Sequence, residues 1–102
     1  MSFVIGIDLG SRNFAASVLE IDSKEKIFKL IETNYWYLEP NKIGERLVVL
    51  EQKLSDLITR YPVKQITYED SVFKGRCAAD LNYCAGIIHY CAAKYKLKLQ
   101  KV

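Results

Sequence analysis

The segment from Val4 to Gly10 constrains the fold of this chain more than any other. Its apolar residues are too few for a buried helix and end at Asp8, and Gly10-Ser11 then marks a sharp turn of the backbone. Residues 14–21 repeat a strand pattern almost at once, so we expect them to form a strand beside residues 3–8. Asp8 then lies where two strands meet, not in a long loop.

Residues 26–37 predict a third strand, joined to the second by the turn-like segment 22–25. Such a short connection implies that the three strands form an antiparallel meander. The aromatic segment 35–37, Tyr-Trp-Tyr, closes the third strand. Packing on an edge strand is its expected role, and stacking on nucleic-acid bases is the alternative.

The second half of the chain predicts two helices that alternate with two strands. Apolar residues recur at helical spacing from Ile43 to Ile58, and the strand over residues 63–69 ends in Glu69. A second helix is expected over residues 76–95 and a last strand over residues 96–102. We therefore expect an α/β fold with a mixed five-stranded sheet, made of the antiparallel meander plus parallel strands, and two helices packed on it.

The expected helix 76–95 carries two apolar stripes. The first alternates spacings of four and three and comprises Cys77, Leu81, Cys84, Ile88, Cys91 and Tyr95. The second lies roughly 120° around the helix axis and comprises Ala79, Tyr83, Ile87 and Tyr90. One stripe can cover the sheet, whereas the other requires a second body. Gly86 also suggests that another element approaches the helix closely.

Composition limits the classes of partner. The formal net charge of +3 is divided into −2 for residues 1–51 and +5 for residues 52–102. A basic second half is compatible with a phosphate-bearing partner, although on charge alone solvated lysines are the favoured explanation. No apolar run is long enough to cross a membrane and no signal peptide is recognisable, so we expect a cytoplasmic protein without membrane contact. The three cysteines lack the spacing of a zinc site and are expected to be reduced core residues.

Two acids end strands that the topology can bring together. If the crossover connections are right-handed and strand 63–69 joins strand 3–8, the two strands are parallel and end at one edge. Asp8 and Glu69 then meet, and their mutual repulsion favours a hard divalent cation such as Mg²⁺. The alternative is that Asp8 caps the turn and that Glu69 is a solvated strand end.

Three segments resemble a known family. They are Ile-Gly-Ile-Asp-Leu-Gly-Ser-Arg-Asn-Phe at residues 5–14, Tyr-Glu-Asp-Ser-Val-Phe at residues 68–73, and Ala85-Gly86 in the following helix. They are similar to the RuvC-type Holliday-junction resolvases of the RNase H-like superfamily, over nearly the whole chain and in the family's element order. The resemblance implies a single RNase H-like domain over residues 1–102, truncated after the fifth strand.

The resemblance also implies an activity and its residues. The family's enzymes are endonucleases of DNA recombination and repair that cut branched DNA by phosphodiester hydrolysis with two Mg²⁺ or Mn²⁺ ions. Asp8 and Glu69 match the first two metal-binding catalytic acids. The expected DNA contacts are Ser11, Arg12, Phe73, Lys74 and Arg76. The expected homodimer interface is the second stripe, Ala79, Tyr83, Ile87 and Tyr90.

The resemblance leaves part of the metal site unassigned. The family places its remaining acids on a helix after the last strand, and this sequence stops before that point. The expectation is an Mg²⁺-dependent endonuclease whose activity in this shortened form stays open, the chain being a fragment, a naturally shortened relative or a subunit that a partner completes. Two other functions stay open: a non-catalytic junction-binding or assembly module with the same fold, and a fragment of an actin-like ATPase fold in which Gly10-Ser11 cradles a phosphate. A second phosphate loop is missing, so we expect no nucleotide cofactor.

Overall fold

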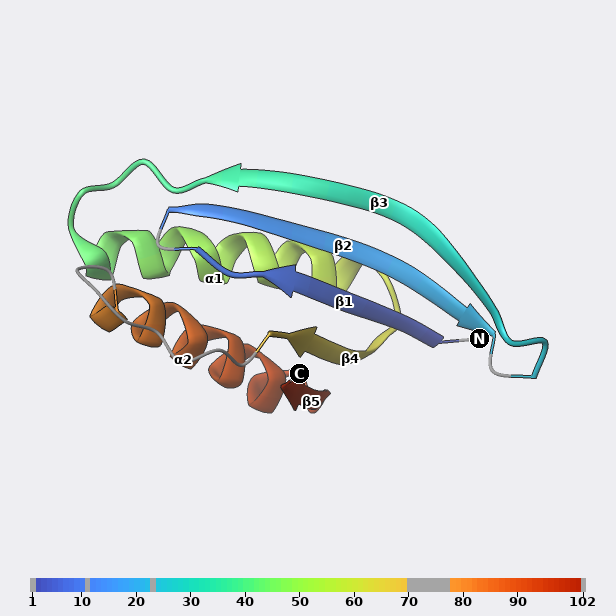
Figure 1. Cartoon of the computed structure of the whole chain (residues 1–102). Coiled ribbons are helices and arrows are strands. Elements are labelled where there is room, and N and C mark those ends of the chain that lie inside the picture. Colours follow the sequence, from blue (N-terminus) through green and yellow to red (C-terminus); the bar gives the residue numbers. More distant parts are fainter. Residues whose placement is uncertain (1, 11, 23, 70–77, 102) are drawn as a thin grey trace.

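A computed structural model of the chain describes residues 2–10, 12–22, 24–69 and 78–101. Its elements follow the predicted order (Figure 1): β1 Ser2–Asp8, β2 Asn13–Asp22, β3 Ile27–Tyr37, α1 Ile43–Arg60, β4 Val63–Tyr68, α2 Ala78–Lys94 and β5 Lys98–Lys101.

The sheet has the strand order β3-β2-β1-β4-β5. β1, β2 and β3 pair antiparallel, whereas β4 pairs parallel with both β1 and β5. The parallel pairs follow from the connections, because α1 and α2 each carry the chain back across the sheet before the next strand begins. The predicted mixed five-stranded sheet, with its antiparallel meander, is confirmed.

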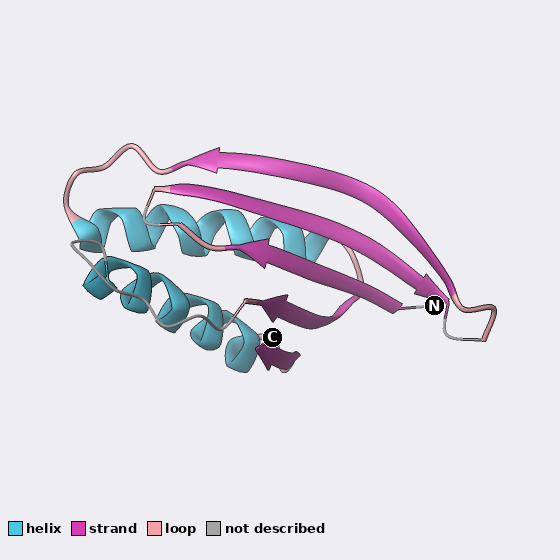
Figure 2. Cartoon of the chain, viewed as in Figure 1, coloured by secondary structure: helices cyan, strands magenta, loops and turns pink. Residues whose placement is uncertain are grey.

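One face of the sheet carries the core. Along β1 the buried residues alternate with more exposed ones, and Ile5 and Ile7 point to the same side as the buried Ala16 and Val18 of β2. The helices α1 and α2 pack against each other and lie on this face (Figure 2). Gly6 and Asp8 alternate with Ile5 and Ile7 along β1, so they belong to the opposite face of the sheet. No helix of the described residues covers that face.

The apolar stripe of α1 contains an unpredicted arginine. Leu50, Leu54 and Leu57 are fully buried, as their spacing predicts, but Arg46 is also only 5% exposed. Its guanidinium donates to Asp80 in the first turn of α2, with Nη2 3.0 Å from Oδ2. Breaking such a pair typically costs about 3–5 kcal/mol, and less where one partner is partly solvated, as Asp80 is. The ion pair therefore ties the start of α2 to α1.

The inner stripe of α2 is confirmed for the residues that the structure describes. Cys84, Ile88 and Cys91 are fully buried, and the two cysteines are free thiols. Burial raises the pKa of both thiols to about 11, which makes them unreactive core residues near neutral pH. Cys77 lies outside the described residues.

The last strand begins two residues later than its alternating pattern predicts. The helix α2 ends in a Schellman motif, in which the Leu97 amide donates to the Ala92 carbonyl at 2.8 Å and the Lys96 amide donates to the Ala93 carbonyl at 3.2 Å. Lys96 takes the left-handed conformation, with φ of 58°, which the motif requires. The expectation of a strand from residue 96 was therefore wrong, because a lysine occupies a position that glycine usually marks.

Candidate active site

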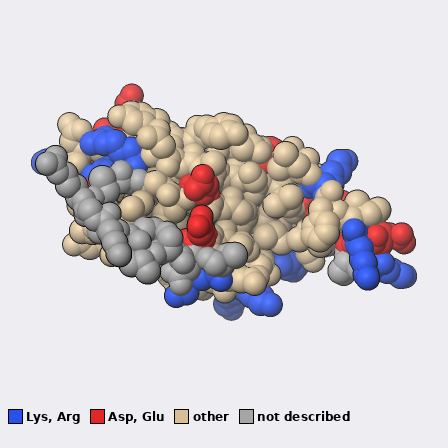
Figure 3. Space-filling model, in the orientation of Figure 1, with Lys and Arg blue, Asp and Glu red and all other residues tan. Residues whose placement is uncertain are grey.

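The carboxyl ends of β1 and β4 bring the two predicted acids together. In the parallel ladder Ile7 lies opposite Tyr68, so the next residues, Asp8 and Glu69, follow side by side on strands about 4.8 Å apart. Both side chains are exposed. Figure 3 shows two acidic groups close together over the ends of these strands. The expected juxtaposition of Asp8 and Glu69 is thus present in the fold.

The two acids line a shallow hollow of about 320 Å³. Gly6 and Ala15 form part of its wall with little side-chain bulk, and Ser17 and Thr67 add hydroxyl groups. All of these donors are oxygens, which suits Mg²⁺ or Mn²⁺ better than a softer metal. Within the described residues no group of three or more Asp, Glu, His or Cys side chains is suitably placed for a metal, so the donor set fits a divalent cation but provides only two carboxylates.

The turn after Asp8 depends on a glycine. A Cβ atom at Gly10 would lie 2.2 Å from the carbonyl oxygen of Asn13, far inside contact distance. The chain can fold back into β2 immediately after the acid only because position 10 lacks a side chain. The sharp turn predicted from Gly10 is confirmed.

Arg12, a predicted DNA contact, has a structural role in the fold. Its guanidinium donates to the main-chain carbonyls of Leu38 at 3.2 Å and Glu39 at 3.0 Å and to Oδ1 of Asn41 at 2.8 Å. These bonds fix the connection from β3 to α1 beside the candidate site. A phosphate contact by Arg12 stays a prediction, and the other predicted contacts, Ser11, Phe73, Lys74 and Arg76, lie outside the described residues.

A tyrosine–histidine pair lies next to Glu69. The hydroxyl of Tyr68, which is only 4% exposed, is 2.7 Å from Nε2 of His89 on α2. The two rings also meet edge to face, with centroids 5.7 Å apart. This contact anchors the last residue of β4 to α2 and so positions Glu69. Sequence reasoning missed the pair, because residues 21 apart on a strand and a helix leave no periodic signal.

The outer stripe of α2 is exposed. Tyr83 and Tyr90 are 55% and 53% exposed, Ala79 is exposed, and Ile87 packs partly against the core. A Cβ atom at Gly86 would meet nothing within 4 Å. The expectation that Gly86 admits a close neighbour is therefore not met within the described chain, where that part of the helix surface is open.

Basic side chains gather near β5, at the border of the face that Figure 3 shows. Lys64 of β4, Lys96 before β5 and Lys98 at its start are exposed. β5 lies next to β4 and parallel to it, so these lysines lie near the starts of the two strands, whereas Glu69 follows the end of β4. In the described part of the chain, neither helix is long and apolar enough to span a membrane.

Comparisons with known proteins identify the fold. No protein-family model matches the sequence, and no curated protein matches it either. Thermus thermophilus RuvC in complex with a Holliday junction substrate superposes with a TM-score of 0.85 at 14% identity, over 98% of this chain and 65% of the RuvC chain.

Two further solved structures are similar over nearly the whole chain. The fowlpox virus Holliday junction resolvase has a TM-score of 0.69 at 16% identity, over 98% of this chain and 60% of its own. The yeast mitochondrial Holliday junction resolvase has the same TM-score and identity, over 99% of this chain and 52% of its own. This chain spans less than two thirds of the length of each relative. Its fold is the RuvC-like RNase H fold, as the sequence motifs predicted.

Proposed function

We propose that this chain is the metal-binding part of a RuvC-like endonuclease that acts on branched DNA. The observation that carries the proposal is the meeting of Asp8 and Glu69 at the ends of two adjacent parallel strands. The structures of RuvC and of the fowlpox resolvase with Holliday junction DNA support branched DNA as the substrate class.

Asp8 and Glu69 would hold Mg²⁺ or Mn²⁺ between them. When bound, such a cation lowers the pKa of a coordinated water and stabilises charge on the oxygens of a phosphodiester. The two carboxylates would fix the position of the cation, and the cation would relieve their mutual repulsion. The low wall of Gly6 and Ala15 leaves room for a phosphate to approach the pair, and the hydroxyl groups of Ser17 and Thr67 can donate to its oxygens.

The remaining contacts belong to the same proposal. We assign contacts with the DNA backbone to Ser11, Arg12, Lys74 and Arg76, and a contact near the junction crossover to Phe73. We assign homodimer formation to the exposed stripe of α2, because a two-fold dimer presents two sites to a four-way junction. The open surface at Gly86 supports this assignment, since it leaves room for a second helix.

The first test measures metal binding and cleavage side by side. Calorimetry with Mn²⁺ and cleavage of a synthetic four-way junction are compared for wild type, Asp8→Asn and Glu69→Gln. Because even residues behind a metal ligand change affinity by about 10–100-fold, we expect losses of at least about a hundredfold for either variant. Glu25→Gln, which changes an exposed acid in the β2–β3 turn, is the matched control. Equal metal binding and cleavage by wild type and Asp8→Asn would remove Asp8 from the mechanism.

A non-catalytic junction-binding module is the second candidate. It is favoured by the presence of only two carboxylates at the site within the described residues. Junction binding that weakens with salt, together with no cleavage in Mg²⁺ or Mn²⁺, would support this candidate over the nuclease. The coding sequence downstream of Val102 distinguishes the two candidate functions independently. Two carboxylates at helical spacing in that sequence would favour the nuclease.

A further inference from the structure

The aromatic segment at the end of β3 leaves two rings largely exposed. Tyr35 is 83% exposed and Tyr37 is 57% exposed. Trp36, between them, is half-buried on the helix-covered face, where Nζ of Lys53 lies 5.9 Å from the ring centroid. Packing on an edge strand, the role expected for the whole segment, accounts for Trp36 but not for Tyr35.

The register of the sheet places Tyr35 in one row with Asp8. Asp8 pairs with Ala15 of β2, and Ala15 pairs with Tyr35 of β3. Directly opposed residues project from the same face, and two strand spacings amount to about 10 Å. The side chain between them in this row is only the methyl group of Ala15. Asp8 and Tyr35 therefore face the same open surface from either side of a small residue.

A hollow of about 290 Å³ occupies this surface. Its wall includes Asp8, Asn13, Ala15, Tyr35 and Tyr37. Asp8 and Ala15 also line the hollow that contains Glu69, so the two hollows adjoin at the candidate metal site. A group bound between the tyrosines and Asp8 would thus be continuous with a phosphate bound at the carboxylate pair.

The chemistry of the hollow suits a flat, uncharged ring. None of its described lining residues is Lys or Arg, so an anion there would face the Asp8 carboxylate without a compensating side chain. Exposed tyrosine rings stack on nucleobases of any sequence. The Asn13 amide can both donate to and accept from the edge of a base. A phosphate therefore fits beside Glu69, and a base fits beside Tyr35.

We propose that Tyr35, assisted by Tyr37 and Asn13, forms a nucleobase-stacking site for the nucleotide whose phosphate lies at Asp8 and Glu69. This inference rests on the proposed function. A base stacked within a duplex cannot reach the tyrosine ring, so the site takes an unstacked base, as a branch point supplies. It thereby favours branched DNA over continuous duplex without reading the sequence.

The experiment measures binding of a labelled four-way junction by fluorescence anisotropy with Ca²⁺ in place of Mg²⁺, so that a hard cation neutralises the carboxylate pair, and a gel of each sample checks that the junction stays uncut. Wild type, Tyr35→Ala and Tyr35→Phe are compared on the intact junction and on junctions with one abasic nucleotide at each branch-point position in turn. Because stacking on an aromatic ring contributes about 1–3 kcal/mol per base, Tyr35→Ala should weaken binding of the intact junction about tenfold or more, while Tyr35→Phe keeps wild-type affinity. At one position the abasic nucleotide should weaken wild type about tenfold and leave Tyr35→Ala unchanged.

Phe28→Ala is the matched control, since Phe28 is an aromatic residue of β3 that is 69% exposed and lies at the opposite end of the strand. It should behave as wild type on every junction. Equal affinity of Tyr35→Ala and wild type, or abasic losses that are the same in both proteins at every position, would overturn the stacking site while leaving the proposed function intact. Failure of wild type to bind any junction would overturn both proposals.

Discussion

Gly10 is the residue on which the position of Asp8 depends most directly. The carbonyl oxygen of Asn13 occupies the place of a side chain at position 10, so the chain turns within a few residues of the acid and returns as β2. Any other residue forces the turn to open. Main-chain geometry thus helps to hold the first carboxylate of the candidate metal site in place.

We predict that Gly10→Ala lowers the free energy of unfolding by about 2 kcal/mol and weakens Mn²⁺ binding, because the turn must shift to relieve the contact with Asn13. Urea denaturation and calorimetry measure the two effects. Gly44→Ala is the control, since a Cβ atom at Gly44 in α1 meets nothing within 4 Å and alanine favours a helix. A Gly10→Ala protein as stable as wild type would show that the turn is not constrained.

The residues of the candidate site differ in how far the sequence could reveal them. Asp8 and Glu69 end short apolar strands, and the connection rules then bring them together, so their meeting was predictable. The burial of Arg46, outside the site, was not predictable, because a charged residue within an apolar stripe is normally solvated. The contact between Tyr68 and His89 was not predictable either, since it depends on how α2 packs against β4.

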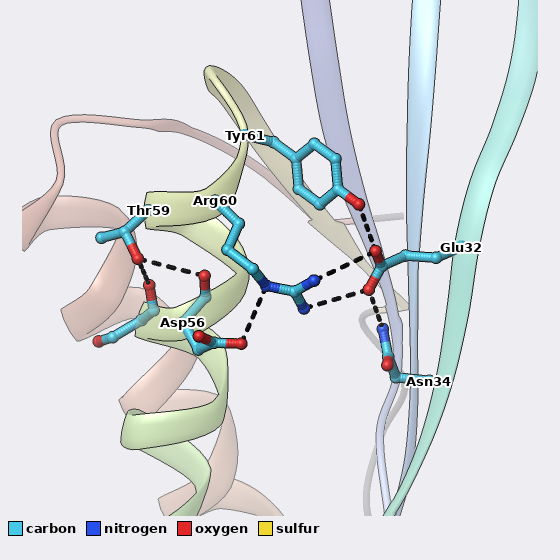
Figure 4. A network of polar contacts seen from close by, with 7 residues as sticks. Glu32, Asn34, Asp56, Thr59, Arg60 and Tyr61 are labelled. Atoms are coloured by element: carbon cyan, nitrogen blue, oxygen red, sulfur yellow. Dashed lines mark hydrogen bonds and ion pairs between the residues drawn. The ribbon is translucent and has the colours of Figure 1, made fainter.

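At the scale of elements, a polar network joins β3 to the end of α1 (Figure 4). Glu32 of β3 accepts hydrogen bonds from Nη2 of Arg60 at 3.2 Å, from the hydroxyl of Tyr61 and from Nδ2 of Asn34 at 2.9 Å. Arg60 also pairs with Asp56 one turn earlier, at 3.0 Å. The network lies on the helix-covered side of β3, next to the register shift in the β2–β3 ladder. It therefore fixes the strand that carries Tyr35.

The network predicts a pH dependence of stability. The hydrogen bond from Asn34, followed by that from Tyr61, lowers the pKa of Glu32 below its ordinary value of 4.5. When a carboxyl group has a lower pKa in the folded state than in the unfolded state, its ionised form stabilises the fold. This stabilisation is fully present above the unfolded-state pKa and is lost as the pH falls through the folded-state pKa. Wild type should therefore have a higher urea midpoint than Glu32→Gln at pH 7, and the gap should narrow as the pH falls below 4.5.

Urea titrations between neutral pH and acid measure that gap, and Glu25→Gln, at an exposed turn position, serves as control. A gap between wild type and Glu32→Gln that stays constant across the acid range would contradict the assigned role of Glu32. The network itself had no sequence signal. Apolar periodicity identifies which elements form, whereas the partners of polar side chains on different elements depend on their packing.

At the scale of the whole molecule, the fold is a sheet covered by helices on one face, with further apolar surface exposed on α2. The order of elements and the parallel pairing of β1 with β4 were predictable, because short connections and helical crossovers permit few arrangements. The partner of the outer α2 stripe was predictable only as a need for a second body. The chain itself buries the inner stripe of α2. Its sequence does not identify the molecule that covers the outer stripe.

We predict that this second body is another copy of the chain. Tyrosine is among the residues that contribute most to interfaces, at about 2 kcal/mol or more each when central, so Tyr83→Ala combined with Tyr90→Ala should raise the dimer dissociation constant by about a thousandfold. Sedimentation equilibrium over a range of protein concentrations measures this constant. Val48→Ala is the matched control, because Val48 is an apolar residue of α1 that is 57% exposed on a different helix. Wild type that stays monomeric at every concentration, or a double variant that dimerises as well as wild type, would show that the tyrosine stripe does not form the dimer interface.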